Sequence, residues 1–245
     1  MKRFLIGALL ASSLFATAAI AEQAPDTLGK IKAAKVINVA YAADSLPFSF
    51  VGADKQPAGY SIDICRHVIA RIGQVVGIPD LKVNWLAGST SERLQMVRSG
   101  KADLECANTT QTLARLASVD FSGLIFVDAG GVILRADSQV NSIAELAGKK
   151  IAVLKDTTTE KRLNAIAAEN LPGARIIAVV DAQEGLKMLG AGSVDAYAGE
   201  RIQLVGAAVQ GSNAGKFVLL TEELSFEPYA MALPRGDSAL RLEVN

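Results

Sequence analysis

The chain has 245 residues, half of them hydrophobic, and its 25 basic residues balance 25 acidic ones. This length allows one large or two small domains. Since there is no basic excess, binding to nucleic acid or to an anionic membrane surface is not expected. Aromatic residues make up only 5% of the chain, so we expect an α/β fold with a core of Ala, Val, Leu and Ile.

The first residues have the layout of a secretory signal peptide. Lys2 and Arg3 are followed by an uncharged, Ala- and Leu-rich stretch over 4–20, which runs into a small-x-small cleavage pattern at 19–21. A membrane anchor is the alternative, but this stretch is shorter than the ~20 apolar residues that a span needs. We therefore expect residues 1–21 to be a signal peptide and the mature protein to be exported and soluble.

Two cysteines, Cys65 and Cys106, and one histidine, His67, occur in the chain. In an oxidising compartment the cysteines can form a disulfide, or they can remain two buried free thiols. No Cys-x-x-Cys or His-Glu-x-x-His spacing points to a metal. We expect no metal and no cofactor, and we expect His67 to lie at the surface.

Predicted strands and helices alternate, which is typical of parallel sheets covered by helices. In the first half we predict strands over 36–40, 81–86 and 103–107, a helix over 61–76, and a second helix from the capping-box pattern at Ser89 to Gly100. The pattern then restarts. We predict strands over 130–135, 150–154, 175–180, 194–198, 216–221 and 229–234, and helices over 183–189, 200–209 and from the capping patterns at Ser142 and Thr157. Two βαβ-type halves therefore meet near residues 126–131.

Ligands of such sheets bind beyond the carboxyl ends of the strands, and polar clusters occupy those positions. Asn108, Thr110 and Arg115 follow the strand 103–107, and an arginine fork matches a carboxylate with two parallel hydrogen bonds. Thr157 and Thr158 stand between a strand and a helix, where a helix N-terminus attracts anions. A surface arginine and ordinary helix capping are the plain structural alternatives.

Two further charged residues can take part in a site. Glu200 follows the strand 194–198 and can hold an ammonium group, or it can be an acid at a helix start. Arg93 lies within the helix after Ser89 and by itself fits a solvated side chain. Gly-x-Ser-x-Gly is absent, and one histidine in a helix makes no catalytic triad. The sequence therefore favours a binding protein over an enzyme.

Several short motifs follow one another in a fixed order along nearly the whole mature chain. They are residues 46–50 (Leu-Pro-Phe-Ser-Phe), 59–63 (Gly-Tyr-Ser-Ile-Asp), 100–106 (Gly-Lys-Ala-Asp-Leu-Glu-Cys), Thr110, Arg115, 119–122 (Val-Asp-Phe-Ser) and 148–153 (Gly-Lys-Lys-Ile-Ala-Val). Taken together, these segments resemble the polar-amino-acid family of periplasmic solute-binding proteins of ABC importers, with the closest likeness to glutamate/aspartate-binding proteins.

The resemblance implies the type II periplasmic-binding-protein fold. In this fold two α/β lobes, each a mostly parallel sheet flanked by helices, are joined by two hinge strands. The chain would pass from one lobe to the other at two hinge crossings, near residues 127–130 and 227–230. Lobe 1 would then contain residues 22–127 plus 230–245, and lobe 2 residues 128–229.

The resemblance also implies a ligand site, by matches to family motif positions. Arg115 is expected to grip the α-carboxylate of an amino acid, and Glu200 to hold its α-ammonium group, where aspartate is usual. The full set of expected ligand-binding residues is Thr90, Arg93, Asn108, Thr110, Arg115, Thr157, Thr158 and Glu200. Thr90 and Arg93 match positions near the ligand's side chain in the acidic-amino-acid group.

Two departures from the family pattern concern the ligand. Acidic-amino-acid binders often carry a further arginine where this chain has Ala42 and Ala43, and Glu200 is one methylene longer than the usual aspartate. Glutamate or aspartate is the favoured ligand, and glutamine or asparagine the alternative. The expected partner is an ABC permease, and the protein is expected to be a monomer. Because relatives continue beyond the position of Asn245, we expect the C-terminal part of lobe 1 to be truncated.

Two other functions remain possible on the same scaffold. Some periplasmic dehydratases of prephenate-like acids resemble this family, and they would need a general acid with a pKa tuned by burial. A receptor's sensor domain is the third possibility.

Overall fold

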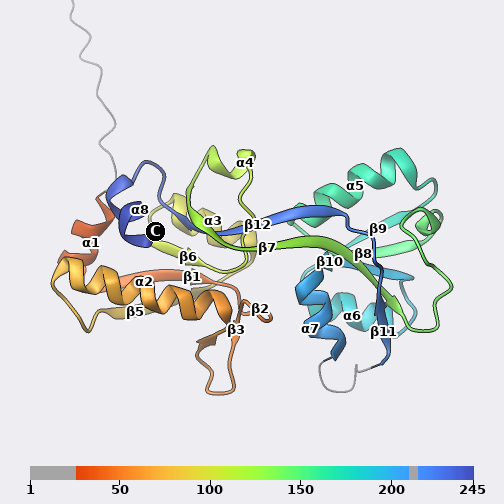
Figure 1. Ribbon diagram of the computed structural model, residues 1–245, viewed down its shortest axis with the longest axis horizontal. Coiled ribbons are helices and arrows are strands. Elements are labelled where there is room, and N and C mark those ends of the chain that lie inside the picture. The colour runs from red at the N-terminus through yellow and green to blue at the C-terminus, as the bar shows by residue number, and fades with distance from the viewer. Residues whose placement is uncertain (1–25, 210–214) are drawn as a thin grey trace, which may run out of the picture.

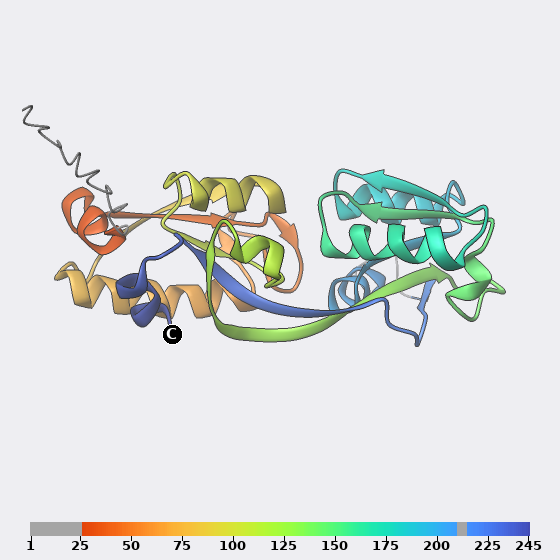
Figure 2. The ribbon, with the colours of Figure 1, turned by 90° about the horizontal axis from the view of Figure 1, so that it is seen from above.

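The computed structural model describes residues 26–209 and 215–245, so the expected signal peptide lies outside the described residues. Figures 1 and 2 show two groups of helices and strands that lie side by side and are bridged by β7 (Asp120–Arg135) and β12 (Ser225–Leu233). We call the group with α1–α4 and α8 lobe 1, and the group with α5–α7 lobe 2.

Lobe 1 is built on three parallel strands in the order β5-β1-β6. One hydrophobic cluster joins this sheet to α1, α2 and α8, and another joins it to α3 and α4, so helices cover both faces. Its elements are α1 (Thr27–Ala34), β1 (Val36–Tyr41), α2 (Tyr60–Val76), β5 (Lys82–Ala87), α3 (Thr90–Arg98), β6 (Leu104–Cys106), α4 (Leu113–Leu116), α8 (Ser238–Val244) and a small sheet of β2 (Asp44–Ser45), β3 (Ser49–Val51) and β4 (Pro57–Ala58).

Lobe 2 repeats this arrangement, with parallel strands in the order β9-β8-β10. In both lobes the first strand therefore lies between the second and the third. Separate hydrophobic clusters join the sheet to α5 on one face and to α6 and α7 on the other. The elements are a 3₁₀ turn η1 (Ala144–Leu146), β8 (Lys150–Leu154), α5 (Thr158–Asn170), β9 (Arg175–Val179), α6 (Ala182–Gly190), β10 (Ala196–Glu200), α7 (Arg201–Val209) and β11 (Phe217–Leu219).

The two bridging strands connect these sheets into one. β12 pairs antiparallel with β7 along most of its length, and the wider order is β6-β12-β7-β10. The expected α/β fold with two lobes and two hinge strands is confirmed. The predicted start of the helix 200–209 was wrong: Glu200 ends strand β10 and does not open the following helix, since its backbone pairs with Gly130 of β7.

Local sequence signals explain where the site-bearing helices begin. The Ser89 hydroxyl accepts from the backbone N–H of Glu92, and the Glu92 carboxylate accepts from the backbone N–H of Ser89, so the predicted capping box starts α3. The Thr157 hydroxyl accepts from the N–H of Glu160 and starts α5. Thr112 caps the short helix α4 in the same way. These caps place polar side chains beside the strand ends.

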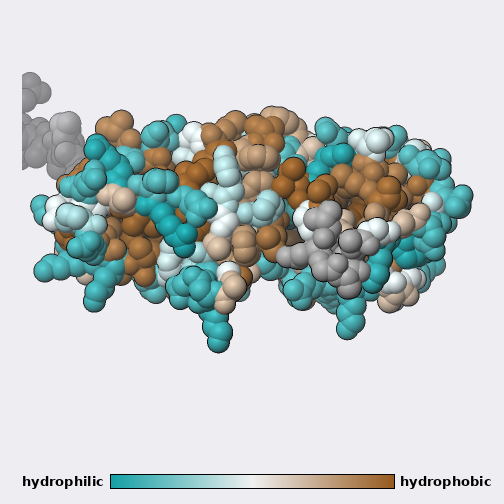
Figure 3. All heavy atoms as spheres, turned by 60° about the horizontal axis from the view of Figure 1, so that its bottom comes forward, coloured by the Kyte–Doolittle hydropathy of each residue, from teal (hydrophilic) through white to brown (hydrophobic). Residues whose placement is uncertain are grey.

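The molecular surface in Figure 3 has hydrophilic and hydrophobic residues interspersed on the face that is drawn. Leu113, Val180, Phe226 and Leu242 are the most exposed large hydrophobic side chains of the described residues. Within residues 26–209 and 215–245, no helix combines the length and the apolar character that crossing a membrane requires.

A disulfide joins Cys65 of α2 to Cys106 at the end of β6. Both residues are fully buried and belong to the main hydrophobic cluster of lobe 1. The bond therefore ties a helix to the strand that leads into the polar loop 107–112. His67, on the same helix, is exposed as expected.

Reduction of this bond is expected to destabilise the protein. Closing a loop with a sequence separation of 41 limits the freedom of the unfolded chain and stabilises the fold by about 3–4 kcal/mol. Urea unfolding of oxidised and reduced protein at one pH measures the difference without changing a side chain. Identical midpoints would contradict a stabilising role. The double variant Cys65→Ala/Cys106→Ala should resemble the reduced protein and no longer respond to reductant.

Candidate functional site

Polar residues from both lobes line one pocket at the carboxyl ends of the parallel strands. The loops after β6, β8 and β10 all reach it. Its walls include seven of the eight expected ligand-binding residues: Thr90, Asn108, Thr110, Arg115, Thr157, Thr158 and Glu200. The eighth, Arg93, is not among the residues that line it. We call this cavity the interlobe pocket.

Sequence reasoning missed several members of the pocket wall: Ser45, Thr109, Tyr197 and Gln203. Two of them had a usable signal. Thr109 lies in the expected loop, and Gln203 lies three residues after Glu200, in the first turn of the predicted helix 200–209. Tyr197 lies in the predicted strand 194–198 and Ser45 lies in the short strand β2, which was not predicted; nothing in the residue pattern singles either of them out.

Arg115 is half-buried on α4, at the lobe 1 side of the pocket. Its Nη1 donates to the carbonyl oxygen of Thr110 at 2.7 Å. Among the described residues, no hydrogen bond uses its Nε or Nη2, so one edge of the guanidinium is left for another acceptor. Burial lowers the pKa of Arg115, while the carboxylates of Glu105, Glu200 and Glu227 act in the opposite direction. An arginine remains charged at neutral pH nonetheless.

Glu200 lies on the lobe 2 side and is 8% exposed. The side-chain amide of Asn108 donates to its Oε2 at 2.5 Å, which joins the two lobes across the pocket. Burial, and to a lesser extent the nearby carboxylate of Glu227, raise the pKa of Glu200 to about 8, although hydrogen bonds from Tyr229 and Asn108 act in the opposite direction. Glu200 is therefore largely protonated at neutral pH until a cation approaches it.

Glu227, on hinge strand β12, is a further carboxylate that lies behind the pocket wall; it is 1% exposed and is not among the residues that line the pocket. Its Oε2 accepts hydrogen bonds from Thr110 of lobe 1 at 2.6 Å and from Thr158 of lobe 2 at 2.7 Å. Ser225 donates to its Oε1 at 2.5 Å. The sequence located this residue only as part of the hinge crossing. The structure makes it the acceptor that joins the hydroxyls of both lobes.

Arg93 lies behind the wall formed by Thr90 and Thr109. It is 3% exposed, and its Nε donates to Oε1 of the fully buried Glu105 at 2.8 Å. Its Nη1 donates to the carbonyl oxygen of Gly88 at 2.8 Å, and Nη2 makes long contacts of 3.4 Å with the hydroxyls of Thr90 and Thr109. The structure thus places this arginine in a buried ion pair.

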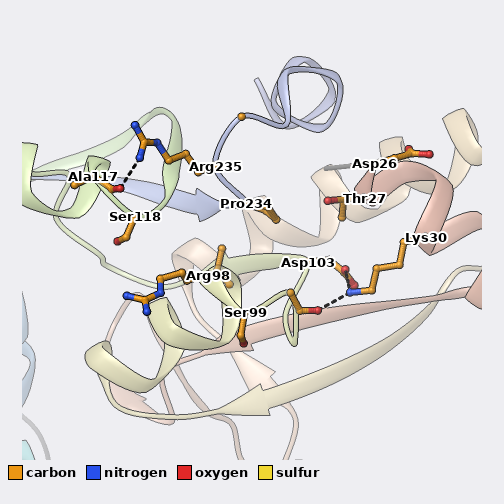
Figure 4. Close-up of a pocket in the computed structure, with 13 residues that line it drawn as sticks. Asp26, Thr27, Lys30, Arg98, Ser99, Asp103, Ala117, Ser118, Pro234 and Arg235 are labelled. Carbon is orange, nitrogen blue, oxygen red and sulfur yellow. Dashed lines mark hydrogen bonds and ion pairs between the residues drawn. The ribbon is translucent and has the colours of Figure 1, made fainter. Parts of the chain in front are cut away.

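A larger hollow of about 1020 Å³ lies elsewhere in lobe 1, between α1, the end of α3 and the segment after β12 (Figure 4). None of the expected site residues lines it. Lys30 pairs with Asp103 at 2.7 Å, and Arg235 donates to the carbonyl oxygen of Ala117 at 2.7 Å, as Figure 4 shows. Three of its charged groups, Lys30, Asp103 and Arg235, are therefore engaged with the protein, and we place the candidate site in the interlobe pocket.

No group of His, Cys, Asp and Glu residues within the described part of the chain could hold a metal ion. The pocket is instead equipped for an organic ion. It carries a guanidinium from one lobe, a carboxylate from the other, and hydroxyls and helix N-terminal groups between them. Such a set can bind a molecule that has both a negative and a positive charge.

Known proteins with similar sequences and folds bind small solutes. The L-glutamate/L-aspartate-binding protein of Pseudomonas aeruginosa is 28% identical over 98% of this chain and 80% of its own length. A periplasmic binding protein from Brucella ovis with glutathione bound has a TM-score of 0.80 at 27% identity, covering 90% of this chain and 68% of its own. An arginine-bound, truncated binding protein from T. maritima shares the fold, with a TM-score of 0.78 at 21% identity over 89% and 96% of the two chains.

The named relatives are binding proteins of transport systems and not enzymes, in agreement with the expectation from the sequence. The family model of the bacterial extracellular solute-binding proteins, family 3, matches residues 37–245, which includes every residue of the interlobe pocket. The chain belongs to the bacterial extracellular solute-binding proteins of family 3.

Proposed function

We propose that the protein captures an amino acid between its lobes and passes it to the permease of an ABC importer. In this proposal Arg115 binds the α-carboxylate and Glu200 binds the α-ammonium group. The observation that carries it is that a guanidinium of lobe 1 and a carboxylate of lobe 2 line one pocket. An amino acid carries both opposite charges on neighbouring atoms, so it can bridge the two lobes.

The chemistry of each end supports these roles. The open edge of the Arg115 guanidinium matches the two oxygens of a carboxylate. Thr157 and Thr158 lie at the N-terminus of α5, whose dipole favours the same negative group. The ammonium group replaces the Asn108 amide as the donor to Glu200 and supplies a full positive charge there.

Ligand entry requires the lobes to separate. The pocket has a volume of about 30 Å³, which is room for about two water molecules. The Asn108–Glu200 bond and the two threonine bonds to Glu227 hold the walls together. An amino acid is larger than this space, so binding is coupled to hinge motion at β7 and β12.

Location and partners are parts of the same proposal. The leader pattern over 1–21 and the kinship with periplasmic binding proteins support export to the periplasm. Lobe 1 would comprise residues 22–127 plus 230–245, and lobe 2 residues 128–229. We propose that the protein is a monomer, because both lobes that enclose the ligand belong to one chain and no second subunit is needed to complete the pocket.

The side chain of the ligand is a separate question. Glutamate or aspartate is favoured by the sequence resemblance, and the Pseudomonas aeruginosa relative is named for these two amino acids. That preference depends on Arg93 being available to a second carboxylate. Arg93 is paired with Glu105 and does not line the pocket.

Substitution of Arg115 by alanine is expected to weaken amino-acid binding by roughly 100-fold or more, because a charge-assisted bidentate pair is lost and the ligand carboxylate is left unpaired. The measurement is titration calorimetry with the amino acid that binds wild type most tightly. Arg98→Ala, which removes an exposed arginine of α3 outside the interlobe pocket, is the control and should bind normally. Unchanged affinity of Arg115→Ala would refute its role.

Affinity is expected to rise about tenfold per pH unit between pH 6 and pH 7.5. The pKa of Glu200 is about 8 in the unliganded protein because of burial and the neighbouring Glu227. A bound ammonium group lowers that pKa, so binding releases a proton, and release is favoured at higher pH. Calorimetry in buffers of different ionisation enthalpy measures the released proton. Glu200→Gln should bind more weakly and without this pH dependence, whereas a wild-type affinity that does not change with pH would contradict the mechanism.

A further inference from the structure

We infer that the interlobe pocket rejects a second carboxylate and selects an amino acid whose side chain is neutral or basic and donates hydrogen bonds. This inference rests on the proposed function and deepens it. Glutamine, asparagine and the basic amino acids belong to the selected class, and glutamate and aspartate do not. Three features of the pocket wall and of the side chains directly behind it carry the inference: the neutralised Arg93, the direction of the hydroxyl bonds, and the charge of Glu227.

Arg93 offers no net positive charge to a ligand. Its guanidinium lies 2.8 Å from the carboxylate of Glu105, and both side chains are almost completely buried. All three of its nitrogens have protein acceptors. If Arg93 turned toward a ligand carboxylate, Glu105 would be left buried without a counterion, which is strongly unfavourable. The pair therefore acts as one neutral unit.

Four threonine hydroxyl groups of the pocket wall present lone pairs to the ligand. A threonine hydroxyl has one proton to donate, and four of these protons are already used within the protein. Thr109 donates to Glu105 at 2.7 Å, Thr110 and Thr158 donate to Glu227, and Thr157 donates to the carbonyl oxygen of Leu154 at 2.7 Å. Hydroxyls in this state accept hydrogen bonds. They suit an amide N–H₂, an ammonium or a guanidinium, whereas an ionised carboxylate can only accept.

Glu227 adds a negative charge that the α-carboxylate and α-ammonium group of the bound amino acid do not cancel. The charges of the ligand's α-carboxylate and α-ammonium group are balanced by Arg115 and Glu200. The Arg93–Glu105 pair is neutral by itself, so the negative charge of Glu227 remains without a balancing positive charge. Among the described residues it has hydroxyl partners and no cation within ion-pair distance. A second ligand carboxylate would be repelled by this buried charge, which lies directly behind Thr110 and Thr158 of the pocket wall, in a region of low dielectric.

The first test measures the affinities of the twenty standard amino acids for the full chain by calorimetry. The expected result is that the tightest ligand has a neutral or basic donor side chain, with glutamine at least about tenfold tighter than glutamate and asparagine tighter than aspartate. Tightest binding of glutamate, of aspartate or of an apolar amino acid overturns the inference and leaves the proposed function intact. If none of the twenty binds, the proposed function itself fails, and the inference fails with it.

The second test changes the charges one at a time. Glu105→Gln frees the charge of Arg93, and Glu227→Gln removes the remaining negative charge, so each should shift the glutamate-to-glutamine affinity ratio toward glutamate by about tenfold. The two variants are independent, and circular dichroism reports whether each is folded. An unchanged ratio in the folded variants overturns the inference.

The matched control removes the buried ion pair as a unit. Arg93→Met/Glu105→Met replaces two opposite charges with apolar side chains of similar length, which buried pairs often tolerate. Because the pair is neutral, the ratio should remain that of wild type. If Arg93 instead receives a ligand carboxylate, this double variant loses affinity for glutamate selectively, and the inference is wrong.

Discussion

The antiparallel pairing of β7 with β12 is the constraint on which the whole pocket depends. These two strands belong to both lobes at once, so they join two parallel sheets into one continuous ladder. β6 lies beside β12 in lobe 1, and β10 lies beside β7 in lobe 2. The polar loops that follow the parallel strands therefore meet over the hinge. Neither lobe alone contains both the guanidinium and the carboxylate.

Glu227 connects this hinge to the walls of the pocket. Its single carboxylate group accepts from one hydroxyl of each lobe, and it lies on the strand that must bend if the lobes separate. A charge in this position is stabilised by three hydroxyl donors and by the field of Arg115. The same charge raises the pKa of Glu200. The contacts that hold the lobes together and the protonation of the ammonium-binding residue are thus parts of one electrostatic arrangement.

Much of the architecture could be predicted from local patterns. The capping box at Ser89, the cap at Thr157 and the apolar face of the helix 61–76 each depend on residues within one or two helical turns, and each appears where expected. The helix α4 and the sheet β2-β3-β4 were not predicted, because elements of two to four residues carry too little periodicity. The strand 130–135 is the second part of a 16-residue strand. Its full length depends on pairing with β12, which is remote in sequence.

The sequence by itself determined the alternation of strands and helices, the two βαβ-type halves and six residues of the pocket wall, because each follows from short-range patterning or from position at a strand end. The two hinge strands and Thr90 were expected from the family resemblance. Only the tertiary structure decided the state of the charges. Arg93 and Glu105 are separated by 12 positions and both face the core, while Thr110, Thr158 and Glu227 come from three distant segments. Whether an arginine is free or paired, and whether a hydroxyl donates or accepts, depends on which groups folding brings within hydrogen-bond distance. Residue type and spacing along the chain do not contain that information.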